Sequence, residues 1–156
     1  MAALNLGRKY DAMDAFEIAA ITSELRSASQ LQLARIHFAD GNPELAAEYA
    51  KKSLVGNSHC TTACAILHLC DANGGWLERI SDLDPLCPFP AIERMLSGRI
   101  TATELAETVK QEQRGQVDLE WVVFYNSLGL NVKALALAEA CPDGNALIGI
   151  WASYLR

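Results

Sequence analysis

Residues 27–58 read SASQLQLARIHFADGNPELAAEYAKKSLVGNS and predict two helices joined by a tight turn. Ser27 and Gln30 have the spacing of a capping box, in which two side chains satisfy free amides of the first helical turn, so we expect a helix to begin at Ser27. Gly41 can adopt the left-handed conformation that ends a helix, and Pro43 has the fixed φ of a first helical turn. The stretch therefore predicts one helical hairpin.

Small side chains lie along the second helix of this hairpin. Ala46, Ala50 and Ser53 follow one another at intervals of four and three residues, which places them on one face of the helix. Because small residues let two helices approach closely, we expect this face to pack against the first helix. Ala46 and Ala50 should then be buried.

Glycine recurs at a fixed interval on both sides of the hairpin. Gly7, Gly41 and Gly75 are separated by 34 residues each, which is the period of a tetratricopeptide repeat (TPR). The chain resembles this family in one complete repeat and in the second half of the repeat before it. The resemblance is carried by Leu33, Ala34, Gly41, Ala46, Ala50 and Ser53 in the complete repeat and by Gly7, Ala12, Phe16 and Ala19 in the half repeat.

Three positions depart from the family's pattern, since Gln30, His37 and Ser58 stand where the family usually has Trp, Tyr and Pro. The resemblance implies antiparallel helical hairpins stacked in a right-handed, TPR-like α-solenoid. Composition agrees with the all-α class, because the helix formers Ala, Leu, Glu and Arg dominate and runs of β-branched residues with period two are absent.

We expect a single TPR-like helical domain over residues 1–156, with an irregular middle section. It would comprise a half repeat plus one full repeat (1–58), a degenerate repeat (59–83), an irregular, Pro-rich helical crossing (84–115), and a degenerate repeat with the start of another (116–156). Besides the hairpin, we expect helices over residues 2–21, 59–72, 76–83, 91–97, 101–113, 116–128, 134–141 and 146–155. A second capping box, Thr101 with Glu104, should open the helix at 101.

The order of these parts resembles the C-terminal repeat region of larger bacterial proteins in which a sugar-mutarotase-like domain precedes the repeats. The match rests on Leu-Asp-Pro-Leu at residues 83–86 and on LEWVVFYNSLGL from Leu119, and it covers residues 64–156. It implies a helical accessory region of a carbohydrate-related protein. The expected helix at 2–21 has no upstream partner, which also favours the tail of a longer polypeptide.

Charge and hydropathy exclude several classes of partner. The chain carries a net charge of −6 without a cluster of Lys or Arg, which argues against nucleic acid and against anionic membranes because both require concentrated positive charge. No apolar run reaches about 18 residues, and the first residues lack the features of a signal peptide. We therefore expect a cytoplasmic protein with reduced cysteines.

Cys60, Cys64 and His68 lie at i, i+4 and i+8 of an expected helix and form the only metal-like grouping in the sequence. Three ligands along one helix hold a metal poorly, so we favour packing of small residues over a zinc site. We disfavour Cys64 with His68 as a catalytic pair for the same reason. Because no Gly-rich phosphate loop, Ser-centred elbow or His-Glu-x-x-His run occurs, we expect neither an enzyme nor a cofactor.

A binding groove is expected on the wall formed by the first helices of the repeats. The resemblance places eight residues on its concave face: Ala28, Leu31, Arg35 and Phe38 in the complete repeat, and Gln116, Leu119, Val123 and Asn126 in the last one. This mixture of apolar and polar side chains suits an extended peptide or a partner helix, and burial under following helices is an equal alternative.

Taken together, these patterns predict a non-catalytic scaffold that binds a protein or peptide partner, or that self-associates as a homo-oligomer. The alternative is the accessory region of a larger carbohydrate-related protein, in which case the partner is the rest of a longer polypeptide.

Overall fold

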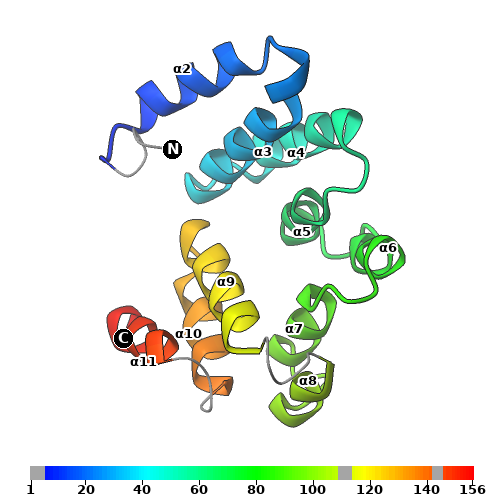
Figure 1. The fold of residues 1–156 in the computed structure, drawn as a ribbon, viewed down its shortest axis with the longest axis vertical. Helices are drawn as coiled ribbons and strands as arrows, with labels where there is room; N and C mark the ends of the chain where they lie inside the picture. The colour runs from blue at the N-terminus through cyan, green and yellow to red at the C-terminus, as the bar shows by residue number, and fades with distance from the viewer. Residues whose placement is uncertain (1–5, 109–113, 142–145) are drawn as a thin grey trace. The chain divides into compact units, whose positions relative to one another are not determined.

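The computed structural model describes residues 6–108, 114–141 and 146–156, and over these residues the backbone is helical with no strand. This confirms the predicted all-α class. The helices are α2 (Lys9–Ala19), α3 (Ser23–Ala39), α4 (Pro43–Gly56), α5 (Thr61–Cys70), α6 (Trp76–Leu83), α7 (Phe89–Leu96), α8 (Ala102–Thr108), α9 (Arg114–Ser127), α10 (Asn131–Ala140) and α11 (Ala146–Leu155) (Figure 1). Within the described ranges, no helix combines the length and the apolar character that crossing a bilayer requires.

The chain divides into two compact units, and the division falls within α6. Unit 1 (Met1–Arg79) contains α2 to α5, in which α3 packs against α2 and α4, and α4 packs against α5. Unit 2 (Ile80–Arg156) contains α7 to α11, in which α10 packs against α9 and α11, and α7 packs against α8 and α10. The expected single domain over residues 1–156 stays a prediction.

The predicted helical hairpin is present as α3 and α4, and a glycine makes its turn. Gly41 has a φ of 75°. The amide of Gly41 donates to the carbonyl of Phe38 (3.0 Å), and the amide of Asn42 donates to the carbonyl of His37 (2.9 Å). This pair of bonds is the Schellman motif, which satisfies the last carbonyls of α3. Pro43 then opens α4, as expected.

The same backbone conformation recurs at the other glycines of the predicted repeat. Gly7 and Gly75 have φ values of 71° and 70°, and Gly129, in the predicted last repeat, has 75°. The residue five positions after each glycine, on the helix that follows it, is buried in every case. These buried residues are Ala12, Ala46, Ile80 and Ala134. The recurrence in the sequence therefore corresponds to a recurrence in structure.

Small side chains let α3 and α4 approach closely. Ala46 and Ala50 have no exposed surface, which confirms their predicted burial. The Ser53 hydroxyl donates to the Ser27 carbonyl (2.9 Å), and the Ser27 hydroxyl donates to the Ser53 carbonyl (2.8 Å). A Cβ atom on Gly56 would lie 3.1 Å from the Cβ of Ser27, so a larger residue there would require Ser27 to shift.

The prediction that a helix begins at Ser27 is wrong. α3 begins at Ser23, four residues earlier, and Thr22 occupies the N-cap position. The Ser27 hydroxyl bonds across the hairpin to Ser53 instead of capping its own helix. A serine hydroxyl can satisfy either kind of partner, and here the partner from the neighbouring helix is used.

Other helix boundaries differ from the predictions by a few residues. The helix expected at 2–21 is α2, which begins at Lys9 after the left-handed Gly7 and ends at Ala19, while residues 2–5 lie outside the described part of the chain. The helix expected at 59–72 is limited to Thr61–Cys70. The helices expected at 76–83 and 146–155 have the predicted bounds.

The middle section corrects one prediction and confirms another. The helix expected at 91–97 begins at Phe89, because Pro88 is its N-cap and Pro90 lies in its first turn, where a missing amide hydrogen breaks no helical bond. The capping box predicted at Thr101 is present: the Thr101 amide donates to Glu104 Oε2 (2.7 Å), and the Glu104 amide donates to Thr101 Oγ1 (3.2 Å). α8 is described as far as Thr108, so positions 109–113 of the expected helix lie outside the described residues.

A cluster of aromatic rings forms the centre of unit 2. Phe89, which is fully buried, lies 4.9 Å from Trp121 and 6.2 Å from Phe124 between ring centroids. It also stacks with Tyr125 at 6.3 Å. The first residue of α7 is therefore anchored against α9.

The turn at Gly41 gives the first testable prediction. An alanine Cβ at this position would meet nothing within 4 Å, so any effect of Gly41→Ala reports the backbone conformation. We expect the free energy of unfolding to fall by about 1–2 kcal/mol, because an L-residue is strained at positive φ. Gly41→Asn should lose less, since asparagine enters this region more readily. Urea denaturation followed by circular dichroism measures both variants, and equal losses would contradict this explanation.

Candidate protein interaction surfaces

The four predicted groove residues of the complete repeat share one face of α3. Ala28 is exposed, and Leu31, Arg35 and Phe38 are half-buried. This face lies opposite the fully buried one, because the buried residues of α3 occupy the intervening helical positions. Burial lowers the pKa of the Arg35 guanidinium below its ordinary value. These four residues together present apolar and cationic surface, and their role in binding stays a prediction.

The four predicted groove residues of the last repeat share a face of α9 in the same way. Gln116 and Val123 are exposed, and Leu119 and Asn126 are half-buried. The Gln116 amide donates to Glu120 Oε1 (3.1 Å), and the Asn126 amide donates to Asn131 Oδ1 (3.0 Å). These four residues belong to unit 2 and the four on α3 belong to unit 1, so each row is a separate candidate surface.

An exposed apolar face that was not among the predicted binding residues lies on α11. Leu147, Ile150 and Tyr154 are 48%, 64% and 75% exposed and follow one another at i, i+3 and i+7. The opposite face holds the buried Ile148 and Ala152, which point toward the rest of unit 2. The signal was present in the sequence, because residues 146–155 read ALIGIWASYL and contain no charged residue.

A second exposed apolar face begins on α2. Tyr10 and Ile18 are 74% and 68% exposed and lie on the side of α2 opposite the buried Ala12. Ile21, in the turn after α2, is 75% exposed. The sequence predicts a helix over residues 2–21 but does not by itself separate the inner residues of that helix from the outer ones. We call the surface of Tyr10, Asp14, Glu17, Ile18 and Ile21 the α2 surface.

Cys60, Cys64 and His68 lie along the start and length of α5. Cys60 is half-buried, while Cys64 and His68 are buried. Burial raises the pKa of the Cys64 thiol, which works against a thiolate nucleophile or ligand. Among the described residues, no group of three His, Cys, Asp or Glu side chains could hold a metal ion. Packing within unit 1 is the interpretation that these positions support.

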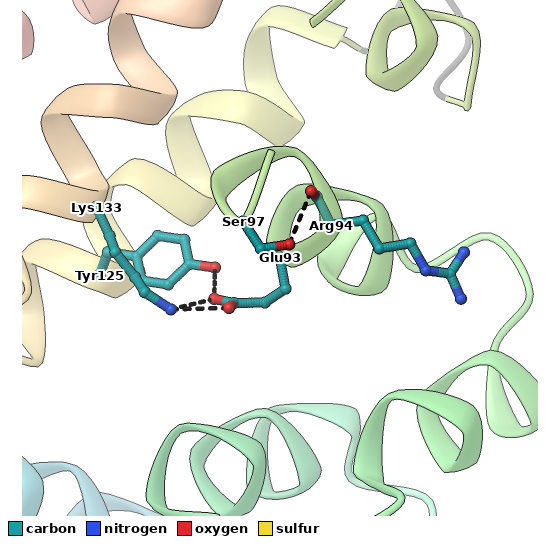
Figure 2. Close-up of polar contacts among 5 residues, drawn as sticks. All are labelled: Glu93, Arg94, Ser97, Tyr125 and Lys133. Atoms are coloured by element: carbon teal, nitrogen blue, oxygen red, sulfur yellow. Dashed lines mark hydrogen bonds and ion pairs between the residues drawn. The ribbon is translucent and has the colours of Figure 1, made fainter. Parts of the chain in front are cut away.

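A buried polar cluster connects three helices of unit 2. The hydroxyl of Tyr125, on α9, donates to Glu93 Oε1 on α7 (2.5 Å), and Lys133 Nζ on α10 donates to Glu93 Oε1 and Oε2 (2.9 and 2.8 Å). Figure 2 shows the phenol and the ammonium group converging on the Glu93 carboxylate. Lys133 Nζ also lies 5.7 Å from the centroid of the Tyr125 ring.

The chemistry of this cluster is that of a structural ion pair. Burial, together with the negative charge of Glu93, raises the pKa of Tyr125 far above its ordinary value, so the phenol stays protonated and donates. These three bonds to the carboxylate come from side chains of the same unit. A buried carboxylate requires such partners, and the cluster therefore fixes α7 against α9 and α10.

The raised pKa of Tyr125 predicts how stability depends on pH. In the unfolded chain a tyrosine ionises near pH 10, whereas folded Tyr125 keeps its proton, so the stabilisation is complete below about pH 10 and is lost as the pH rises further. Tyr125→Phe should lower the free energy of unfolding by about 1–2 kcal/mol at pH 7 and make its decline above pH 10 less steep. Urea denaturation at a series of pH values measures both effects.

Tyr10 provides the matched control for this measurement. Its side chain is 74% exposed and lies outside unit 2, so Tyr10→Phe should leave both the stability at pH 7 and the alkaline decline close to those of the original chain. A Tyr125→Phe variant that declined as steeply as the original chain would show that Tyr125 ionises normally.

Comparison of the chain with protein-family models, with curated proteins and with solved structures gave no match. The two family resemblances therefore remain hypotheses, and the contacts and exposed faces of the chain itself are what support a function.

Proposed function

We propose that this chain is a non-catalytic, TPR-like protein interaction module, and that α11 joins two copies of it. The observation that carries the proposal is the outer face of α11, where Leu147, Ile150 and Tyr154 form an exposed apolar stripe on a helix without charge.

Free energy favours covering this stripe. Burying a large apolar side chain contributes about 1.5–3 kcal/mol relative to leaving it exposed, and three such residues lie together here. The ring of Tyr154 is already ordered by an edge-to-face contact with Trp151, with ring centroids 5.7 Å apart. Less conformational entropy is then lost when a partner covers it. A helix that is apolar on all sides is normally found buried.

A second copy of the same helix fits the chemistry of this face. In a two-fold symmetric interface each patch meets its own copy, so a charged residue near the axis would oppose itself. The exposed face of α11 has no such residue.

Two further observations support the rest of the proposal. The hairpin of α3 and α4 has the small-residue contact and the left-handed glycine expected of a TPR-like repeat, and Gly7 and Gly75 have the same φ at 34-residue intervals. Two buried groups that could be reactive are held in unreactive forms: burial raises the pKa of the Cys64 thiol, and Glu93 is bound by Tyr125 and Lys133. A role in protein binding requires no reactive thiol or carboxylate.

Charge placed on α11 tests self-association. Ile150→Glu with Tyr154→Glu should weaken dimerisation by about a hundredfold or more, because each glutamate would be buried against its own copy. Sedimentation velocity over a concentration series measures the change. Leu86→Glu is the matched control, since Leu86 is 82% exposed in unit 2 but lies outside α11. An original chain that stays monomeric throughout the series would refute the proposal.

Gly149→Ala separates the interface from the stability of the chain. Glycine within a helix is destabilising by about 0.5–1 kcal/mol relative to alanine, and no contact within the described chain requires it. We therefore expect the variant to unfold at higher urea while its dimerisation stays unchanged, because Gly149 lies on a different side of α11 from Leu147, Ile150 and Tyr154. Weaker dimerisation of Gly149→Ala would show that the contact lies on another side of α11.

A further inference from the structure

We propose that the α2 surface is a docking site for a basic amphipathic helix of a partner protein. This inference deepens the proposed function and rests on it, because it names the chemistry of a partner for a second face of the same module. The α2 surface consists of Tyr10, Asp14, Glu17, Ile18 and Ile21.

The geometry of the α2 surface suits a helix. Tyr10, Asp14 and Ile18 follow one another at i, i+4 and i+8, so they form a row of roughly 12 Å along one side of α2. The opposite side holds the buried Ala12 and packs against α3. The row therefore faces away from the helix that α2 contacts within unit 1.

The turn after α2 holds Ile21 at the end of this row. Arg26 donates to the carbonyls of Ala20 and Ile21 (3.2 Å each), and the Thr22 hydroxyl donates to the carbonyl of Ala19 (2.9 Å). These bonds fix the backbone of the turn while the Ile21 side chain stays 75% exposed. An ordered backbone that presents an exposed isoleucine lowers the entropy cost of binding through it.

The charges on α2 are not balanced among the residues that the structure describes. Arg8 pairs with Asp11 (2.5 Å) and Lys9 pairs with Asp40 (2.9 Å), so both cations at the start of the helix already have carboxylate partners. Asp14 and Glu17 form no ion pair with any residue that the structure describes. Two exposed carboxylates thus lie between the apolar side chains of Tyr10 and Ile18.

This charge pattern selects the partner. A neutral apolar helix would cover Asp14 and Glu17 without supplying a counter-charge, which carries a desolvation cost. A second copy of the α2 surface would oppose carboxylate with carboxylate in a symmetric contact. A helix with apolar residues at i, i+3 or i+4 and i+7, flanked by Lys or Arg, provides both the apolar contacts and the opposite charge. This is the occupant that the surface fits.

Titration with designed peptides tests this inference. The probe is a fluorescein-labelled, 21-residue amphipathic helix of leucine and lysine, and its counterpart carries glutamate in place of lysine. Binding is read by fluorescence anisotropy on the Ile150→Glu, Tyr154→Glu chain, so that it does not depend on self-association through α11. We expect the lysine peptide to bind at least about tenfold more tightly than the glutamate peptide, with affinity falling as salt is added.

Matched variants show whether the peptide binds at the α2 surface or is attracted only by the net charge of the chain. Asp14→Asn with Glu17→Gln should weaken binding about three- to tenfold. Glu78→Gln with Asp82→Asn removes the same charge from exposed positions on α6 and should leave the affinity unchanged. Ile18→Ser should weaken binding about tenfold, while Val55→Ser, at a residue that is 91% exposed on α4, should not.

Two results would overturn the inference. One is equal weakening by the α2 and α6 double variants, which would assign the attraction to net charge alone. The other is equal binding of the original and the Ile18→Ser chains, which would show that the apolar row is not in contact. Either result leaves the self-association of α11 to stand or fall on its own measurement.

Discussion

The close contact between α3 and α4 is the constraint on which unit 1 depends. Two backbones can approach this closely only where side chains are small, and Ala46, Ala50 and Ser53 provide that along α4. The reciprocal hydroxyl bonds between Ser27 and Ser53 then satisfy carbonyls on both helices. Because a buried polar group without a partner is costly, this pair also fixes which residue of one helix faces which residue of the other.

The turn at Gly41 and the serine contact differ in how far the sequence could predict them. A glycine followed by a proline near the end of an apolar periodic segment specifies a left-handed turn through local sterics, and the prediction was confirmed. The start of α3 was wrong because Ser27 has two possible partners, and only the presence of α4 decides between them. Local rules predict turns well, whereas tertiary contacts move helix ends by several residues.

In unit 2, too, local features were predictable from the sequence and long-range contacts were not. The capping box of Thr101 and Glu104 is local and was predicted, whereas Glu93 was not recognised as a buried residue. Its partners Tyr125 and Lys133 lie 32 and 40 residues further along the chain, so no local pattern could join them. Pro88 and Pro90 belong to the expected Pro-rich crossing ahead of the helix predicted at 91–97, yet they begin α7 and place Phe89 in the aromatic core. Proline specifies the absence of a donor, and the surroundings decide whether that absence ends a helix or starts one.

The two exposed apolar faces illustrate why a candidate surface is harder to predict than a fold. The sequence places an apolar residue on a helix, but its exposure depends on which neighbours cover it. Leu137 on α10 is fully buried while Ile150 on α11 is 64% exposed, although both belong to apolar helices of unit 2. The two exposed faces differ in charge, and the sequence shows this directly. α11 carries no charged residue, whereas Asp14 and Glu17 lie among the apolar residues of the α2 surface. An uncharged face tolerates its own copy, whereas an acidic face would oppose like charges in a symmetric contact, so the two faces differ in the kind of partner that they can accept.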